Sequence, residues 1–464
     1  MACVIAAPAS GSGKTLLSLC LVAWARQFGH SIQPFKVGPD YLDPQLLSLA
    51  ANQSCRNLDL PLCGRDWVQL SFNGYGGRCE MALVEGVMGL FDGIGSSSEG
   101  STADVAISLC LPVVLVVDAG GQSRSLGALV QGFRDLDPRL NLAGVVLNRV
   151  SSPRHRELLE EVLTDIGVHC LGCLPGDPSL ELPNRHLGLA PAHELSSVQK
   201  RLGRWAALAE QHLDMGVFRA LLQAPKPGPD PVRHVLSAEL ETSQRESLPV
   251  AVAQDEAFHF RYPEMQECLE VLEMPVLPWS PLSDSAPPQQ ACGLILPGGF
   301  PELHAMRLSQ CKAFFSALQQ WIHHKPLYAE CGGMLLLGRK LADLEGQLHA
   351  MAGLLPFEAR RGRLQVGYRS LEAHGDSLLL HQGETLRGHE FHRWQLNIES
   401  DQSVGGRGPL WQVEGWKVER RAEGWNLPNL HASWVHLHWA GSSMIPCRWR
   451  DALGSAARRN AVAS

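Results

Sequence analysis

Short apolar runs alternate with longer amphipathic segments through the first half of the chain. The runs show no polar alternation and occupy residues 4–7, 81–85, 111–118 and 142–147. A segment with helical periodicity, residues 16–28, follows the first of them. Continuous apolar runs are typical of parallel strands that helices cover on both faces. The pattern therefore predicts a doubly wound α/β domain built on a parallel sheet.

A proline-rich break separates this half from a second set of apolar runs. Proline occupies alternate positions within residues 224–231, which disfavours regular structure and predicts a stiff connector. Strand-like runs resume at residues 250–253 and 293–296. A chain of 464 residues is also too long for a single core. We therefore expect one domain at residues 1–224, a linker at 225–248 and a second domain at 249–464.

Composition and charge exclude two classes of partner. The formal net charge is −7 and the chain has no basic tract, so we expect no nucleic-acid partner. No apolar stretch reaches the roughly 18–20 residues that a membrane span requires, so we expect no membrane partner. The apolar start, residues 2–9, has no basic leader and runs into a glycine loop, which predicts a first strand and not a signal peptide.

The thirteen cysteines are scattered along the chain. Their odd number and wide spacing argue against a disulfide framework and predict reduced thiols in a cytoplasmic protein. One pair, Cys170 and Cys173, has CxxC spacing but lies in an apolar segment with no second pair at zinc-ribbon spacing. For this pair the sequence favours two buried small hydrophobic residues over a metal site.

Residues 8–15 have a phosphate-loop pattern between the first predicted strand and the first predicted helix. Backbone amides of such a loop cradle phosphates, its lysine reaches the β/γ oxygens and its hydroxyl binds Mg²⁺. Pro8 stands where the full pattern has glycine, and a chance match to an ordinary loop is the alternative. The nucleotide-binding residues expected from the pattern are Gly11, Ser12, Gly13, Lys14 and Thr15.

Polar residues follow several of the predicted strands. Asp40 and Asp43 come after residues 34–37, Glu85 ends the strand at 81–85, and Asp92 lies on the loop beyond it. The carboxyl edge of a parallel sheet binds ligands, although a solvated turn also accounts for the first two aspartates. Phosphate-loop enzymes need an acidic residue on a neighbouring strand to hold the metal, and Glu85 is the candidate beside Thr15. Asn148, after a late strand, is a candidate base-reading residue or a turn residue.

Cys331 ends an apolar run and precedes Gly332 and Gly333, with a helical pattern over residues 334–341. A strand-to-helix turn of this kind mounts a nucleophile, and the amides behind it point toward an oxyanion. Gly298 and Gly299 follow another strand, where they supply further oxyanion donors or only a tight turn.

A base for the thiol is expected near the C-terminus. Residues 430–439 alternate like a strand, so His436 and His438 face the same way, and His436 is the candidate base with His438 beside it. Two histidines at this spacing also suit zinc, and residues 388–392 add more imidazole. The spacing matches no zinc-protease motif, because HEFH is one residue short of HExxH.

With the turn at Cys331, the glycine pair at 298–299 and the histidines at 436 and 438, this half resembles a class I glutamine amidotransferase domain. Such domains are α/β folds that hydrolyse glutamine through a Cys-His pair. In the usual pattern a glutamate follows two residues after the histidine, but His438 occupies that place. The third triad member is therefore absent or replaced in this chain.

The whole chain resembles the cobyrinic/cobyric acid synthase family, with motifs in the same order over nearly all of its length. The resemblance implies that ATP phosphorylates peripheral carboxylates of a corrin ring and that ammonia from L-glutamine then displaces the phosphate. It favours the branch that amidates the a and c acetates in cobalamin biosynthesis. The positions that it places in the synthetase site, for metal binding or for steering the corrinoid carboxylate, are Asp40, Tyr41, Leu42, Asp43, Glu85 and Asp92.

The resemblance implies Mg²⁺ as cofactor and leaves the oligomeric state open, with a homodimer as one option. Sister enzymes that act on Ni-sirohydrochlorin or at the cobyric acid step are the nearest alternatives. A non-enzymatic ATPase switch with an inactive second domain is an alternative from another class.

Overall fold

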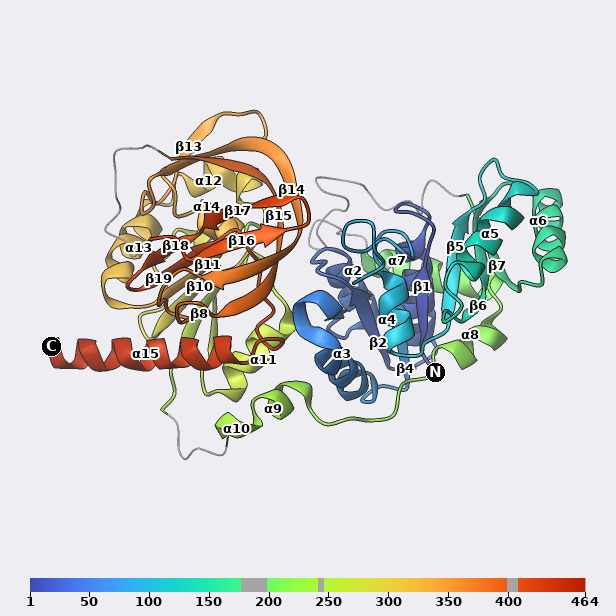
Figure 1. Ribbon diagram of the computed structural model, residues 1–464, viewed down its shortest axis with the longest axis horizontal. Helices are drawn as coiled ribbons and strands as arrows, with labels where there is room; N and C mark the ends of the chain where they lie inside the picture. The colour runs from blue at the N-terminus through green and yellow to red at the C-terminus, as the bar shows by residue number, and fades with distance from the viewer. Residues whose placement is uncertain (177–197, 241–245, 399–407, 464) are drawn as a thin grey trace. The chain divides into compact units, whose positions relative to one another are not determined.

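A computed structural model describes residues 1–176, 198–240, 246–398 and 408–463. The chain forms two compact units, Met1–Pro231 and Val232–Ser464 (Figure 1). Each unit is built around its own parallel sheet. No helix within these described ranges has both the length and the apolar character to cross a membrane.

The first unit is organised by a seven-stranded parallel sheet with the order β3-β2-β4-β1-β5-β6-β7. The strands are β1 (Cys3–Ala6), β2 (Ile32–Val37), β3 (Arg56–Leu58), β4 (Met81–Glu85), β5 (Val113–Asp118), β6 (Leu142–Val150) and β7 (Cys170–Pro175). The helices are α1 (Lys14–Gln27), α2 (Asp43–Ala51), α3 (Leu60–Gly76), α4 (Thr102–Ser108), α5 (Ser125–Asp135), α6 (Pro153–Asp165), α7 (Val198–His212) and α8 (Met215–Leu221). The doubly wound α/β prediction is confirmed for this unit.

Helices cover both faces of this sheet, which explains the continuous apolar runs. Ile5 of β1 packs in a core with residues of α1, α2, α7 and α8. Its neighbour Val4 packs on the opposite face with residues of α3, α4, α5 and α6. Because successive side chains of a strand point to opposite faces, both faces of β1 must be apolar. The loops at the carboxyl ends of these strands then remain for polar chemistry.

The second unit contains two six-stranded sheets. The first has the order β18-β19-β11-β10-β8-β9, with β18 antiparallel and the others parallel. Its strands are β8 (Val250–Ala253), β9 (Val276–Trp279), β10 (Gly293–Leu296), β11 (Leu327–Glu330), β18 (Trp425–Leu427) and β19 (Leu430–Ser433). The second sheet comprises β12 (Lys340–Ala342), β13 (Leu348–Ala350), β14 (Phe357–Ala373), β16 (Trp411–Gly415) and β17 (Val418–Glu423), with β15 (Thr385–Ile398) paired to β14.

Helical segments surround the first of these sheets. They are α11 (Pro263–Val271), η3 (Pro281–Ser283), η4 (Pro301–His304), α12 (Ala305–Leu308), α13 (Lys312–His324), α14 (Gly332–Leu335) and α15 (Met444–Ala463). The predicted α/β architecture of this half is confirmed, and the sheet order brings β11 and β19 side by side.

Two elements of the second unit are shorter than predicted. The helix expected over residues 334–341 is only the short α14, because Leu335, Leu336 and Leu337 are all buried and the chain turns directly into β12. The strand expected over residues 430–439 ends at Ser433. Beyond it the Trp434 amide donates to Glu423 Oε1 at 2.9 Å, which removes it from the ladder.

The proline-rich segment is packed against the first unit. A Cβ on Gly77 would lie 2.4 Å from Cα of Pro227, and one on Gly76 would lie 2.8 Å from Cγ of Pro225. The expected connector is also partly helical, because α9 (Pro231–Val235) and α10 (Ser237–Leu240) fall within it. Residues 241–245 lie outside the described residues. The exact linker bounds, 225–248, stay a prediction.

Candidate active sites

The phosphate loop connects β1 to α1, as predicted. Gly13 is the residue before the helix and has φ 112°, a left-handed conformation that a side chain would strain. The N-terminus of α1 therefore follows directly on a tight turn. Free amides at such a helix start, together with the helix dipole, form an anion site.

Lys14 bridges the phosphate loop and the loop after β4. Its Nζ donates to the Met88 carbonyl at 2.6 Å and to the Ala9 carbonyl at 3.4 Å. Burial, reinforced by the positive charge of Lys36, lowers the pKa of Lys14 to about 8. The ammonium is thus held between the two loops by neutral carbonyl partners, and its contact with phosphate stays a prediction.

The side chain of Asn148, in β6, contacts the phosphate loop. Its Nδ2 donates to the Ser12 carbonyl at 3.0 Å, and a Cβ on Gly13 would lie 2.3 Å from the same nitrogen. The Arg149 amide donates to Asn148 Oδ1 at 3.0 Å. The structure therefore brings Asn148 against the phosphate loop, and contact with a nucleotide base stays a prediction.

Glu85 lies at the centre of the polar cluster beside this loop. It is fully buried, and its Oε1 accepts from Thr15 Oγ1 at 3.0 Å and from Lys36 Nζ at 2.8 Å. Within the described chain, Oε2 has no hydrogen-bond partner. Burial raises the pKa of Glu85. The predicted pair of Thr15 and Glu85 is therefore in contact, with one carboxylate oxygen available to a further ligand.

Lys36 is a site residue that the sequence reasoning missed. Its side chain is 2% exposed, and its Nζ donates to Asp43 Oδ2 at 2.5 Å and lies 3.7 Å from Asp40 Oδ2. Burial alone would lower the pKa of this ammonium, but the carboxylates around it, Asp43 and Glu85 foremost, raise it well above its ordinary value. In the sequence, the pattern that could have indicated this residue is a lysine within an apolar strand just before two aspartates.

The pKa values of the carboxylates in this cluster shift in different directions. Burial, together with the charge of Asp43, raises the pKa of Asp40 to about 7. Asp43 keeps a lowered pKa despite its burial, because Lys36 pairs with it. Between these two, Tyr41 and Leu42 have buried side chains, at 9% and 8% exposure. Their expected contact with a substrate stays a prediction.

Asp92 is the exposed member of the acidic set. Its Oδ2 accepts from the Gly89 amide at 2.8 Å. Its negative charge also acts on Lys14, whose pKa it raises slightly against the effect of burial. The structure thus brings the predicted acidic residues toward the same edge of the sheet as the phosphate loop.

Cys331 occupies a sharp turn between β11 and α14. Its backbone has φ 45° and ψ −107°, which is unusual for a residue with a side chain, and its amide donates to the Ser433 carbonyl at 2.7 Å. Strained strand-to-helix turns present nucleophiles in this way. The side chain is 6% exposed, and Sγ lies 3.9 Å from the Phe391 carbonyl oxygen.

His436 is the histidine that the structure brings to this thiol. Its backbone pairs with His389, with N–O distances of 2.8 and 3.0 Å. Burial lowers the pKa of His436, but the charge of Cys331, a hydrogen bond with it and the nearby Glu330 raise that pKa to about 10. The imidazole of His436 is therefore favoured in its charged form, which can donate a proton.

Glu330 supplies the carboxylate that the sequence reasoning did not find. Its Oε1 lies 3.4 Å from His436 Nδ1. Its Oε2 accepts from the Tyr328 hydroxyl at 2.5 Å and from the Leu437 amide at 3.1 Å. The available signal was an acidic residue immediately before the nucleophile. The acidic neighbour of His436 therefore comes from the end of β11.

His438 lies in a different environment. Its Nε2 is 3.8 Å from Glu264 Oε2, and its ring packs on Tyr262 with centroids 4.6 Å apart. The two histidines do not continue one strand, because β19 has already ended. A role for His438 in catalysis stays a prediction.

The glycines expected near the oxyanion lie around the turn at Cys331. A Cβ on Gly332 would lie 2.9 Å from the Gly299 nitrogen, so the two backbones are in contact. A Cβ on Gly298 would lie 2.6 Å from Cε1 of His436, so this glycine makes room for the imidazole. The loop after β10 therefore lies against both the turn at Cys331 and the imidazole of His436.

The zinc alternative at the histidines finds no support among the described residues. His392 Nδ1 pairs with the Trp394 carbonyl at 2.9 Å, and its ring stacks on Trp434. The side chains with metal-ligand geometry that the described ranges do contain are Glu160, Cys170 and Cys173, in the other unit.

Comparison with known proteins covers both halves of the chain. Residues 3–189 match the CobQ/CobB/MinD/ParA nucleotide binding domain, and residues 249–444 match the CobB/CobQ-like glutamine amidotransferase domain. The cobyrinate a,c-diamide synthase of Gloeobacter violaceus is 41% identical over 445 residues, 95% of this chain and 94% of that protein. The enzyme of the same name from Synechococcus is 39% identical and covers 96% of each chain. The hydrogenobyrinate a,c-diamide synthase of Streptomyces coelicolor is also 39% identical over 96% of each chain.

Proposed function

The chain belongs to the cobyrinate a,c-diamide synthase family, and from that premise we propose how its residues divide the reaction. It is a glutamine-dependent carbon–nitrogen ligase that forms the a,c-diamide in cobalamin biosynthesis. These relatives favour this reaction over the Ni-sirohydrochlorin and cobyric acid alternatives and over an inactive ATPase switch. The observation that carries the residue assignment is the buried contact of Cys331 with a histidine that a carboxylate orients.

Glutamine is hydrolysed in the second unit. The Cys331 thiolate attacks the side-chain amide carbon, and backbone amides near Gly299 and Gly332 stabilise the oxyanion. The tetrahedral intermediate collapses when the carbon–nitrogen bond breaks and His436 gives its proton to the leaving ammonia. Water, deprotonated by the same imidazole, then cleaves the thioester and releases glutamate. Glu330 holds the imidazole in orientation and favours its charged form throughout.

The corrinoid carboxylate is activated in the first unit. A carboxylate oxygen of the substrate attacks the γ-phosphorus of ATP, and the bond to ADP breaks. Lys14 and the amides of the phosphate loop stabilise the phosphoryl charge during this transfer. Ammonia then attacks the acyl phosphate, inorganic phosphate leaves, and the nitrogen loses a proton to give the amide. Two rounds convert the a and c acetates.

Mg²⁺ fits the residues beside the phosphate loop. Thr15 offers a hydroxyl and Glu85 a buried carboxylate with one oxygen that has no hydrogen-bond partner in the described chain. Oxygen ligands of this kind are those that Mg²⁺ prefers. When bound, the ion would neutralise phosphate charge. The role that remains for Lys36 is to hold Asp43 and Glu85 in place, since it contacts both.

Mass spectrometry of the reaction product tests this function. Purified protein is incubated with cobyrinic acid, ATP, Mg²⁺ and glutamine labelled with ¹⁵N in the side-chain amide. The expected product is a diamide with two labelled nitrogens, located at the a and c acetates by NMR. An unchanged substrate, or label on other side chains of the ring, would contradict the proposal.

A further inference from the structure

The CxxC pair of the first unit has an arrangement that its sequence spacing does not predict. In a regular strand, side chains three positions apart point to opposite faces. Here β7 shifts register against β6 between Cys170 and Gly172, and Gly172 has φ 152°. This irregularity turns both sulfurs to the same side, with Sγ–Sγ at 3.7 Å. The expectation of two buried hydrophobic residues fails for Cys170, which is only half-buried.

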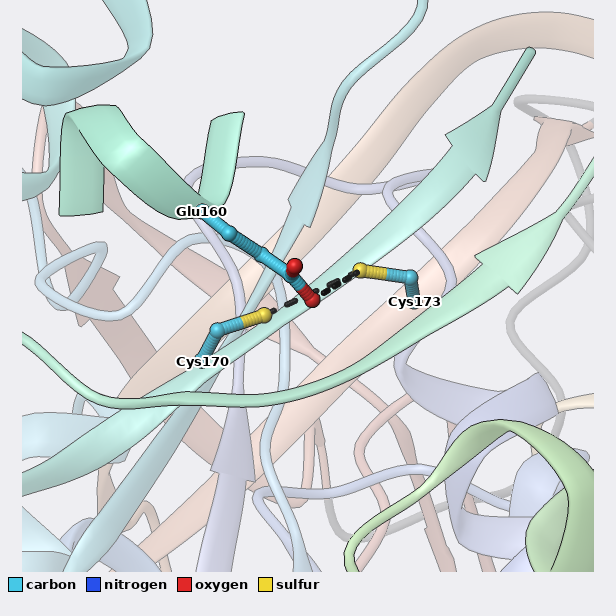
Figure 2. A group of neighbouring side chains, drawn as sticks. All are labelled: Glu160, Cys170 and Cys173. Atoms are coloured by element: carbon cyan, nitrogen blue, oxygen red, sulfur yellow. Dashed lines mark hydrogen bonds between the residues drawn. The ribbon is translucent and has the colours of Figure 1, made fainter. Parts of the chain in front are cut away.

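Glu160 of helix α6 completes the group (Figure 2). Its Oε1 lies 3.9 Å from Cys173 Sγ, and the ligand atoms of all three residues lie within 4.8 Å of one another. Two thiolates bound to one tetrahedral Zn²⁺ at about 2.3 Å lie about 3.8 Å apart. The observed sulfur separation therefore matches a chelating pair and far exceeds the roughly 2.0 Å of a disulfide bond.

The charges around this group also suit a divalent cation. Two thiolates and one carboxylate carry three negative charges, of which a divalent ion neutralises two. Arg156 supplies the remaining positive charge, because its Nε donates to Glu160 Oε1 at 2.8 Å. Outer hydrogen bonds of this kind orient ligating carboxylates. Glu160 and Arg156 are 37% and 49% exposed, so an ion can reach the site from solvent.

We propose that Cys170, Cys173 and Glu160 bind one Zn²⁺, with water in the fourth position, and fasten helix α6 to strand β7. The two sulfurs select a thiophilic ion over the Mg²⁺ that the phosphate-loop site would hold. None of its three ligands is among the residues assigned to either reaction, so its effect is on the stability of this part of the sheet.

Titration with Co²⁺ under anaerobic conditions tests the proposal. Fully reduced protein in the Cys331→Ala background is used, so that the catalytic thiol contributes nothing. The expected result is one equivalent of Co²⁺ per chain with a thiolate-to-metal charge-transfer band, lost on addition of Zn²⁺. Oxygen-ligated Co²⁺ at the phosphate loop would give no such band.

Substitutions assign the ligands. Cys170→Ser and Cys173→Ser should abolish the band, whereas Cys110→Ser, at an exposed cysteine of the same unit, should retain it. Glu160→Gln should keep the band but weaken Zn²⁺ binding about tenfold or more. Zn²⁺ should also raise the Tm of the Cys110→Ser protein and not that of Cys173→Ser.

Two results would overturn the proposal. One is reduced Cys331→Ala protein that gives no thiolate-to-Co²⁺ band. The other is a band that survives in both serine variants. If air oxidation instead joins residues 170 and 173 in a disulfide and the reduced protein gives no band, the pair is a redox couple and not a zinc site.

Discussion

The backbone of Cys331 adopts a conformation that few residues with side chains tolerate. Its φ of 45° places the thiol at the end of β11, where Ser433, His436 and Glu330 meet. The sequence predicted that this thiol meets a late histidine, because the Cys-Gly-Gly turn and the late histidines are local patterns; their catalytic roles stay a prediction. It did not predict Glu330, because that contact depends on the parallel pairing of β11 with β19, which joins distant segments.

Glu330→Gln tests the orienting role of this carboxylate. The nearby anion favours the charged imidazole, so its loss should lower the pKa of His436 from about 10. Glutamine hydrolysis needs that imidazolium to protonate ammonia. The alkaline limb of the kcat/KM profile should therefore move down by about one pH unit or more.

The matched control for this test is Glu345→Gln, at an exposed carboxylate of the same unit. It should leave the profile unchanged. An alkaline limb at the wild-type pH in a folded Glu330→Gln protein would show that Glu330 does not act on the base.

The same pKa predicts how stability responds to pH. A histidine whose folded pKa is raised stabilises the folded state fully below its unfolded value of about 6.5. This contribution of His436 should be lost as pH rises through about 10. Chemical denaturation at a series of pH values should show this loss in the wild type and a smaller one in His436→Asn. Equal pH dependence of the two proteins would contradict the assigned pKa.

Gly298→Ala tests the space that the base requires. A Cβ there would lie 2.6 Å from Cε1 of His436, so the imidazole must move away from the thiol. Glutaminase activity should fall about tenfold or more, since small misplacements of catalytic groups are costly. Amidation with added ammonium salt should persist. Gly375→Ala, where a Cβ meets nothing within 4 Å, is the control and should behave as wild type.

At the scale of elements, apolar runs located the strands well but not every boundary. Strands β1, β4, β5, β8 and β10 coincide with runs that have no polar alternation, because both of their faces are buried. The strand after residue 430 was predicted too long, since buried polar partners interrupt its ladder beyond Ser433. The packing of the proline-rich segment on α3 was also not predicted, because composition indicates stiffness but not a docking surface.

Gly77→Ala tests that packing. A Cβ there would lie 2.4 Å from Cα of Pro227, and a backbone atom cannot yield as a flexible side chain can. Overpacking of this kind should lower the free energy of unfolding by about 1–3 kcal/mol. Chemical denaturation measures the change. Gly132→Ala, in helix α5 with nothing near the added methyl, should be neutral or stabilising. Equal stability of the two variants would show that the segment is not held at this point.

At the scale of the whole molecule, the proposal assigns phosphoryl transfer to the first unit and glutamine hydrolysis to the second. The phosphate loop, the acidic residues and the thiol were predicted because each follows a strand at the edge where parallel sheets bind ligands. The contacts of Lys36 and the clustering of Glu160 with Cys170 and Cys173 were not predicted, because they come from strand neighbours and from a register shift. Local spacing thus predicted which polar groups gather at these sheet edges, and tertiary pairing decided which residues contact them.

Lys14→Ala tests the assignment of phosphoryl transfer to the first unit. The substitution removes the cation beside the phosphate loop, so ATP-dependent amidation should fall by orders of magnitude with either nitrogen source. Glutamine hydrolysis measured alone should persist, because the second unit is unaltered. Ser10→Ala, at an exposed position of the same loop, is the control and should retain amidation. Normal amidation by Lys14→Ala would refute the assignment.

The most direct test of the division of labour is the nitrogen source used by Cys331→Ala. Amidation of cobyrinic acid is measured with glutamine and, separately, with ammonium chloride, beside Cys292→Ala as a control at a half-buried thiol of the same unit. The account predicts that Cys331→Ala makes no amide from glutamine and makes it from ammonium at close to the wild-type rate. Loss of both activities in a folded protein, or retained use of glutamine, would contradict it.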